Sequence, residues 1–140
     1  MSETVRGTSV AIAGRGVLLR GESGSGKSDL ALRLIDRGAV LVSDDYTEVC
    51  LRDGRLLARS PATIAGKIEV RGVGIVTLPA AMNVPLCLLV DLERTPERLP
   101  DGPVPAEVAN TVIPAVALAA LEASAPLKVE AALRLYGLNP

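Results

Sequence analysis

Histidine, phenylalanine and tryptophan are absent from this chain of 140 residues, which holds only two tyrosines and two cysteines. The lack of histidine excludes any mechanism within the chain that uses an imidazole as a base or as a phosphate carrier. With so few aromatic rings, the core must consist of Val, Leu, Ile and Ala, and it depends on dense packing of branched side chains. Acid–base chemistry must therefore come from other side chains.

The cysteines, the charges and the length limit the location, the partners and the number of domains that we expect. Cys50 and Cys87 both lie in apolar, strand-like runs, so we expect free thiols rather than a disulfide or a metal site. The net charge is −1 with both signs mixed, so we expect neither a nucleic acid nor a membrane as partner. Residues 1–6 lack the basic and apolar blocks of a signal peptide. The sequence predicts a cytoplasmic protein with a single domain over residues 1–140.

The most informative segment comprises residues 21–28, which read Gly-Glu-Ser-Gly-Ser-Gly-Lys-Ser. This pattern is typical of a phosphate-binding loop, in which bare backbone N–H groups surround a polyphosphate. Lys27 would reach the outer phosphates, and the Ser28 hydroxyl would bind Mg²⁺. We therefore predict a site for a nucleoside triphosphate, with the binding residues Gly21, Glu22, Ser23, Gly24, Ser25, Gly26, Lys27 and Ser28.

The flanks of this segment support the prediction. Residues 16–20 read as a buried strand, and residues 29–37 read as a helix that ends at Gly38. Strand, loop and helix in this order are the context that the motif requires. They favour a phosphate-binding loop over a plain Gly/Ser-rich surface turn.

The rest of the chain is predicted to be mostly strands. Residues 8–12 and 17–20 read as one hairpin, and residues 46–51 and 56–59 as a second one with Asp-Gly in its turn. Further strands are predicted at 39–42, 67–76 and 86–90, a helical turn at 61–64, a proline-rich loop at 96–105 and a helix at 124–136. The secondary structure of the apolar run at 111–118 stays open, because Pro114 interrupts it. The fold class is therefore α/β, a mixed, strand-rich sheet with a helix after the loop and a C-terminal helix.

Phosphoryl transfer also needs metal ligands and a group that orients or deprotonates the nucleophile. Asp44 and Asp45 directly follow a buried strand, where parallel sheets place functional residues. A solvated turn is the alternative for this pair. Asp91 ends another apolar strand and fits a second nucleotide motif as well as it fits an ordinary strand end. Glu69 reads, by periodicity alone, as an exposed strand residue.

Three segments in order carry a family resemblance: residues 21–28, residues 41–45 (Leu-Val-Ser-Asp-Asp) and residues 68–75 (Ile-Glu-Val-Arg-Gly-Val-Gly-Ile). Each is shared widely, but their order and spacing resemble the HPr kinase/phosphorylase family over residues 5–98. The resemblance implies the catalytic (C-terminal) domain alone, in the short, single-domain form of some bacteria. It also implies a P-loop nucleotide-binding core that resembles phosphoenolpyruvate carboxykinase.

The activity that this resemblance implies is that of a protein serine kinase. Such a kinase uses ATP and Mg²⁺ to phosphorylate the phosphocarrier protein HPr, can remove the phosphate by phosphorolysis, and regulates carbon metabolism through the phosphotransferase system. The family tends toward hexamers, which implies a homo-oligomer, while a truncated C-terminus leaves a smaller oligomer or a monomer open.

By the same resemblance, the catalytic residues are Lys27, Asp44, Asp45, Arg71 and Arg98. Lys27 would neutralise the β- and γ-phosphates. Asp45 would accept the proton of the incoming serine, and Asp44 would support it. Glu69 would join Ser28 as a ligand of the metal, so Asp91 is no longer the preferred candidate for a metal ligand.

Two further features belong to this comparison. Arg71 would lie in a signature catalytic strand with Gly72 and Gly74, whereas Arg98 is the best match to an arginine that the family uses further along the chain. The family usually carries a catalytic histidine where this chain has Arg6. A guanidinium does not give up its proton, so it cannot replace an imidazole in proton exchange. Arg6 would instead lower the pKa of Asp45 or bind phosphate directly.

The basic loop that the family uses for dephosphorylation is also not recognisable, because residues 110–121 hold no Lys or Arg. We therefore hypothesise that kinase activity survives while phosphorolysis is weak or lost.

Two other classes of function stay open on the sequence alone. One is a regulator that binds ATP without transferring phosphate, and the other is a small-molecule P-loop kinase that uses Asp91 as its metal partner.

Overall fold

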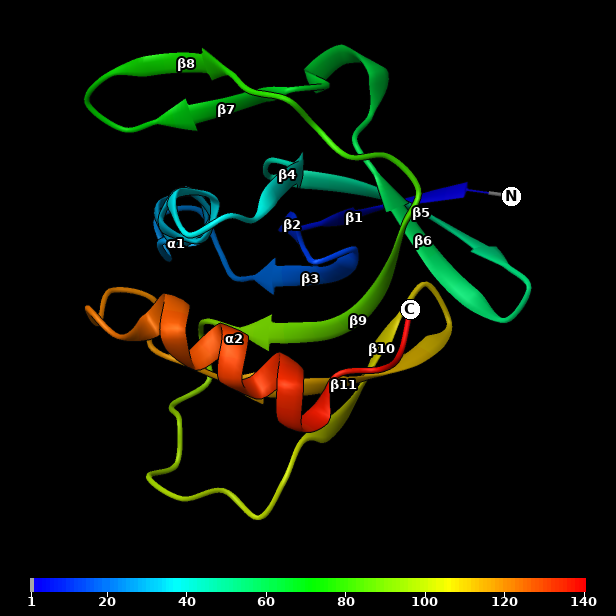
Figure 1. The fold of residues 1–140 in the computed structure, drawn as a ribbon, viewed down its shortest axis with the longest axis vertical. Coiled ribbons are helices and arrows are strands. Elements are labelled where there is room, and N and C mark those ends of the chain that lie inside the picture. The colour runs from blue at the N-terminus through cyan, green and yellow to red at the C-terminus, as the bar shows by residue number, and fades with distance from the viewer. Residues whose placement is uncertain (1) are drawn as a thin grey trace.

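The computed structural model describes residues 2–140, and Figure 1 labels its elements in chain order. The helices are α1 (Lys27–Asp36), α2 (Ala125–Tyr136) and one 3-10 turn, η1 (Ala62–Ile64). The strands are β1 (Ser2–Arg6), β2 (Thr8–Ile12), β3 (Arg15–Arg20), β4 (Val40–Ser43), β5 (Tyr46–Arg52), β6 (Arg55–Arg59), β7 (Lys67–Val70), β8 (Gly74–Thr77), β9 (Val84–Asp91), β10 (Val104–Val108) and β11 (Thr111–Ala117).

Nine strands are connected through hydrogen bonds into one sheet, in the order β1-β5-β6-β9-β3-β2-β4, with β11 beside β9 and β10 beside β11. Strands β3, β9 and β11 run parallel to one another. Strand β2 is antiparallel to both β3 and β4, so β4 runs in the same direction as β3. The C-terminal ends of β3, β4, β9 and β11 therefore lie at one edge of the sheet, where parallel sheets place their sites.

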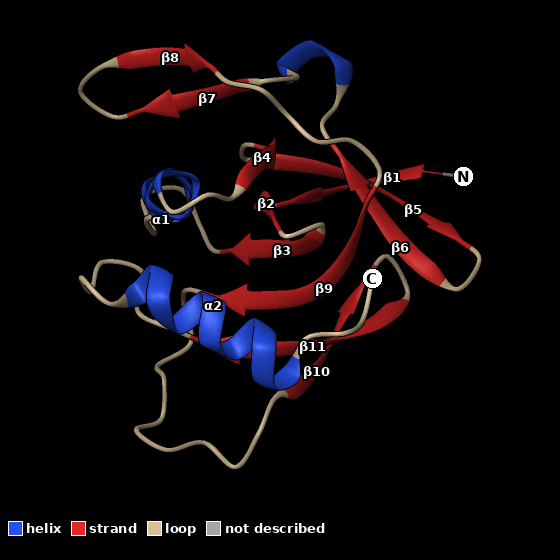
Figure 2. Ribbon diagram, viewed as in Figure 1, coloured by secondary structure: helices blue, strands red, loops and turns tan. Residues whose placement is uncertain are grey.

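Both faces of the central strands are buried, and successive residues alternate between the faces because strand side chains have a period of two. In β3, Val17 and Leu19 belong to the core cluster that includes α1 and α2, whereas Leu18 belongs to a second cluster with β5, β6 and β11. Both helices thus pack on one face of the central sheet (Figure 2). This double burial explains why the strands read as continuous apolar runs.

The mixed, strand-rich α/β class with a helix after the loop and a C-terminal helix is confirmed. Strand β1 is an addition that the sequence did not indicate, because its residues are largely exposed and show no apolar alternation. It forms by antiparallel pairing with β5, from Ser2 opposite Cys50 to Arg6 opposite Tyr46. Helix α1 starts at Lys27 rather than at residue 29, so it includes the last two loop residues.

The predicted strand at 67–76 is wrong as a single element. The chain reverses between β7 and β8, where Gly72 has φ +85° and the Val73 N–H donates to the Val70 carbonyl at 2.9 Å. Glycine tolerates this left-handed conformation, so the alternating pattern is folded into a hairpin. The run at 111–118, which the sequence left open, is strand β11.

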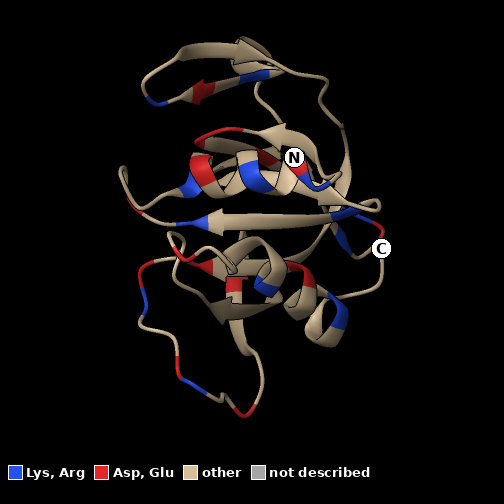
Figure 3. Cartoon of the chain, turned by 60° about the vertical axis from the view of Figure 1, so that its left-hand side comes forward, with Lys and Arg blue, Asp and Glu red and all other residues tan. Residues whose placement is uncertain are grey.

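The remaining expectations concern thiols, charges and membranes. Cys50 and Cys87 are both free, and burial raises the pKa of the Cys87 thiol. Figure 3 shows acidic and basic residues interspersed along the chain. No helix within residues 2–140 is long and apolar enough to span a membrane.

Candidate active site

A cavity of about 570 Å³ lies where the loop after β3, the end of β4 and the β7–β8 hairpin come together. The hairpin passes over α1 and β4, as Figure 1 shows. Most of the residues predicted for the site line this one cavity: Ser23, Gly24, Gly26, Lys27, Ser28, Asp44, Asp45, Glu69 and Arg71. Gly21, Glu22 and Ser25 complete the loop without lining the cavity.

Lys27 is almost buried at the base of the loop, with 5% of its surface exposed. Its Nζ donates to the carbonyl of Gly21 at 2.8 Å and to that of Glu22 at 3.1 Å. The same Nζ lies 3.8 Å from Oδ1 of Asp45. The ammonium therefore joins the loop to the end of β4, and it brings a positive charge to the cavity in a position to meet an anion.

Three glycines allow the loop its shape. Gly24 and Gly26 have φ +86° and +95°, which other residues rarely adopt. A Cβ on Gly26 would lie 3.0 Å from Cβ of Ala120, and a Cβ on Gly21 would lie 2.5 Å from Oγ of Ser25. The Ser25 hydroxyl is the one buried side-chain polar atom within residues 2–140 that has no hydrogen-bond partner.

The carboxylate of Asp44 connects three elements of the fold. Its Oδ1 accepts from Oγ of Ser28 at 2.6 Å and from Oγ1 of Thr8 at 3.1 Å. Its Oδ2 accepts from the backbone N–H of Glu69 at 3.1 Å. Asp44 is 8% exposed and holds α1, β2 and β7 around itself. Its role is therefore to organise the site.

Asp45 differs from its neighbour in exposure and in hydrogen bonding. Its side chain is 49% exposed and lines the cavity. Among residues 2–140, Lys27 is its one ion-pair partner, and no donor hydrogen-bonds its carboxylate. An exposed carboxylate that accepts no hydrogen bond can accept a proton from a hydroxyl group held in the cavity.

The other predicted residues divide between the cavity and the surface. Glu69 and Arg71 are exposed on the β7–β8 hairpin and line the cavity. Arg98 lies in the exposed segment after β9, and it lines neither this cavity nor a smaller one on the other side of the loop. The structure therefore does not bring Arg98 to the other site residues.

Asp91 serves a local purpose. Its Oδ1 accepts from the N–H groups of Glu93 and Arg94, and its Oδ2 lies 3.5 Å from the Arg20 guanidinium. Burial tends to raise the pKa of Asp91, but these two N–H groups and the Arg20 charge outweigh it, so the pKa is lowered. Asp91 thus organises the turn after β9, and it does not line the first cavity, where the other metal-ligand candidates lie.

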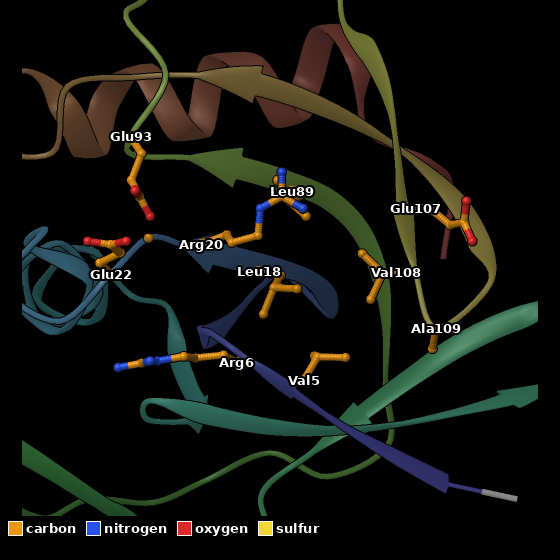
Figure 4. A pocket seen from close by; sticks show the side chains of 11 residues that line it. Val5, Arg6, Leu18, Arg20, Glu22, Leu89, Glu93, Glu107, Val108 and Ala109 are labelled. Carbon is orange, nitrogen blue, oxygen red and sulfur yellow. The ribbon is translucent and has the colours of Figure 1, made fainter.

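A second cavity of about 410 Å³ lies on the other side of the loop (Figure 4). Leu18, Leu89 and Val108 provide apolar lining, and Arg6 and Arg20 project from the strands beside it. Arg6 forms no ion pair within the described residues, and it does not line the first cavity. The effects that we expected of Arg6 on Asp45 therefore have no contact to support them.

The side chains of the first cavity suit a magnesium ion that shares phosphate oxygens. Within residues 2–140 no three Asp, Glu or Cys side chains gather as a metal site of their own. Mg²⁺, however, commonly binds through one or two carboxylates together with phosphates and water. The side-chain oxygens of Ser28 and Glu69 at the cavity have the required chemistry.

Thr8 is the site residue that sequence reasoning missed. Its hydroxyl contacts both aspartates, donating to Asp44 Oδ1 and accepting from the Asp45 N–H at 3.0 Å. In the sequence, Thr8 is an ordinary β-former at the start of a strand. No local signal could have shown that this strand begins beside the end of β4.

Comparison with known proteins points to one family. The model of the HPr Serine kinase C-terminal domain family matches residues 1–84. The chain belongs to this family. HPr kinase/phosphorylase of Clostridium beijerinckii is 49% identical over 72 residues, which are 51% of this chain and 24% of the relative. HPr kinase/phosphorylase of Clostridium tetani is 45% identical over 76 residues, 54% of this chain and 25% of the relative. The chain thus matches about a quarter of each relative's length.

A solved structure extends the family likeness beyond the matched sequence. The Hpr(Ser) kinase/phosphatase from Coxiella burnetii is similar with a TM-score of 0.81 and 25% identity, over 94% of this chain and 88% of that chain. The HPr kinase fold therefore includes the strands and the helix that follow residue 84, where the family model finds no sequence match.

Proposed function

We propose that this chain is an ATP-dependent protein serine kinase that phosphorylates an HPr-like phosphocarrier protein. The observation that supports this most directly is that Lys27 and Asp45 face one cavity with 3.8 Å between Nζ and Oδ1. A cation for the transferred phosphate and a free carboxylate for the acceptor hydroxyl are the two charges that such a transfer needs. Membership of the HPr kinase family supports the choice of acceptor.

In this proposal the Gly21–Ser28 segment acts as a P-loop in a nucleotide-binding core like that of phosphoenolpyruvate carboxykinase. Lys27 would leave its loop carbonyls and donate to the β- and γ-phosphates. Bound Mg²⁺, held by Ser28 and Glu69 with phosphate oxygens, would neutralise phosphate charge. Arg71, which lines the cavity, would add a further positive charge near the transferred group.

The transfer itself is a single displacement. The serine hydroxyl oxygen forms a bond to the γ-phosphorus while the bond from that phosphorus to the β–γ bridging oxygen breaks. The hydroxyl proton passes to the Asp45 carboxylate, and ADP leaves. Asp44 keeps the neighbouring elements in place through its three accepted hydrogen bonds.

The test is incubation of the protein with γ-labelled ATP, Mg²⁺ and the HPr of the same organism, followed by detection of label on HPr. We expect label on a serine of wild-type HPr and none when that serine is replaced by alanine. Label on no protein, with ATP still bound, would favour a nucleotide-binding regulator instead. Label on a small metabolite would favour the small-molecule kinase.

We also propose that the reverse reaction, phosphorolysis of phosphorylated HPr, is weak or absent. The chain has no histidine to exchange a proton with Asp45, and Arg6 at the family position lies against the second cavity. The measurement is release of pyrophosphate from phosphorylated HPr and inorganic phosphate. Release as fast as the forward transfer would refute this. A cytoplasmic location, a role in the phosphotransferase system and a homo-oligomer stay predictions.

A further inference from the structure

The backbone at Asp45 is strained. Asp45 has φ +66°, and the Tyr46 N–H donates to the Asp44 carbonyl at 2.7 Å, which closes a three-residue turn centred on Asp45. A positive φ with this bond is the pattern of the γ-turn that proteins use rarely because it is strained. Such strain at a functional residue persists only where the surroundings hold it in place. Neighbouring groups must therefore hold Asp45 in this conformation.

Two neighbours on the β1–β2 segment hold this turn. The backbone N–H of Gly7 donates to the Asp45 carbonyl at 2.8 Å. The Asp45 N–H has a side chain as its acceptor, namely Thr8 Oγ1 at 3.0 Å. The same hydroxyl donates its proton to Asp44 Oδ1 at 3.1 Å. Because a hydroxyl has one proton, its use at Asp44 leaves only lone pairs toward Asp45 and fixes the direction of both bonds.

We propose that Thr8 is a positioning residue for phosphoryl transfer, whose hydroxyl holds the strained turn so that the Asp45 carboxylate faces the cavity. Thr8 is fully buried and does not line the cavity, so it does not touch a substrate there. It acts through the backbone of Asp45, and its hydroxyl shares Asp44 Oδ1 with the Ser28 hydroxyl. The catalytic consequence rests on the proposed kinase function, whereas the effect on the turn does not.

Thr47 offers a matched control for the change of a buried threonine. It is also fully buried, and its hydroxyl donates to the Gly7 carbonyl at 3.0 Å and meets Ser9 Oγ at 2.9 Å. It hydrogen-bonds to neither aspartate side chain. Replacing either threonine by valine removes one buried hydroxyl and keeps the side-chain shape. A merely structural role for Thr8 predicts similar effects of the two changes on activity.

The experiment compares Thr8→Val, Thr8→Ser and Thr47→Val in transfer from γ-labelled ATP to HPr. We expect Thr8→Val to lower kcat about 10- to 100-fold, because small misplacements of a catalytic group have effects of this size. The KM for ATP should stay within about threefold, since no ground-state phosphate contact is lost. Thr8→Ser restores the hydroxyl and should restore kcat to within about threefold of wild type. A kcat loss in Thr47→Val equal to that in Thr8→Val would overturn the proposal.

A second measurement tests the turn without reference to activity. Backbone NMR shifts and amide exchange at Asp45 report its φ and its hydrogen bond in wild type and in each variant. We expect Thr8→Val, but not Thr8→Ser or Thr47→Val, to speed exchange of the Asp45 amide and to shift its carbon resonances. Unchanged values in Thr8→Val would overturn the proposal even if wild type transferred no phosphate. If Thr8→Val does not fold, Thr8→Cys, whose thiol is a weak hydrogen-bonding group, takes its place with the same expectations.

Discussion

Residues 2–84 and residues 85–140 are held together by different interactions. Within residues 2–140, all six buried polar or charged residues belong to the first part: Thr8, Ser9, Lys27, Ser43, Asp44 and Thr47. The buried residues of the second part, within the described chain, are all apolar. Hydrogen-bonded networks require particular side chains, whereas apolar cores tolerate changes that keep volume and pattern. The residues with the buried polar network are those that the family sequence model matches, residues 1–84, whereas the fold matches over 94% of the chain.

The largest expected effect follows from removal of the ammonium at the base of the loop. Lys27→Ala should lower transfer to HPr by about 10³-fold or more and also weaken ATP binding, because the charge acts on phosphates in both states. Isothermal titration and the labelled-ATP assay measure the two quantities. Lys67→Ala, an exposed lysine on β7, is the control and should match wild type in both. Unchanged ATP affinity in Lys27→Ala would separate this residue from phosphate binding.

Removal of the free carboxylate should affect the chemical step more selectively. Asp45→Asn should lower kcat about 10²- to 10³-fold, the usual range for loss of a general base, and leave the ATP dissociation constant within about threefold. Asp53→Asn is a matched control, since Asp53 also has a positive φ but lies in the β5–β6 turn. Equal losses in both variants would show that backbone conformation, and not the Asp45 charge, is responsible.

In the apolar second part, the expected effect is on stability. Leu133 is 3% exposed on α2, and Leu133→Ala should lower the free energy of unfolding by about 2–4 kcal/mol because it leaves a cavity. Leu135 on the same helix is 72% exposed, and Leu135→Ala should change it by less than about 0.5 kcal/mol. Urea denaturation measures both. The comparison of the two parts fails if folded Leu133→Ala loses transfer as severely as Asp45→Asn.

The two predicted catalytic arginines allow a smaller test of the same comparison. Arg71 lines the cavity, and Arg71→Ala should lower transfer about tenfold, as expected for one charge near the transferred phosphate. Arg98 is exposed outside it, and Arg98→Ala should keep transfer within about twofold. Rates under saturating ATP and HPr decide the point. A large loss in Arg98→Ala would mean that the segment after β9 reaches the site during transfer.

The smallest effect concerns pH. The pKa of Asp91 is lowered in the folded state, so its contribution to stability is present above the ordinary pKa of Asp, about 3.9, and is lost as pH falls through the lower folded value. Asp91→Asn should therefore flatten the pH dependence of stability below about pH 4 and leave transfer at neutral pH unchanged. Thermal unfolding across this range measures it. A variant as acid-sensitive as wild type would contradict the assignment.

The sequence allowed prediction wherever a short segment follows a known local pattern. The loop at 21–28 follows from its glycine spacing, and the turn at Asp53-Gly54 follows from a known hairpin pair. Strand β1 could not be predicted, because only pairing with β5 makes its polar residues extended. Pro114 obscured β11, yet it faces Pro105 on the edge strand, and pairing with β9 begins at Ala115.

The site shows the same limit. Asp44 and Asp45 are neighbours in sequence and were predicted together, but their different roles depend on donors from Thr8, Ser28 and Glu69. These donors lie 36, 16 and 25 positions from Asp44. No spacing rule connects residues across such distances, so only the fold reveals which of the two carboxylates accepts hydrogen bonds.

The most direct test of the central claim is a crystal structure of the protein with Mg²⁺ and a non-hydrolysable ATP analogue. We expect the phosphates in the loop at residues 21–28, with the Lys27 ammonium hydrogen-bonded to the γ-phosphate and the Asp45 carboxylate facing that phosphate across a space for a hydroxyl group. A nucleotide bound elsewhere with this loop empty, or Asp45 turned away from the γ-phosphate, would contradict the account.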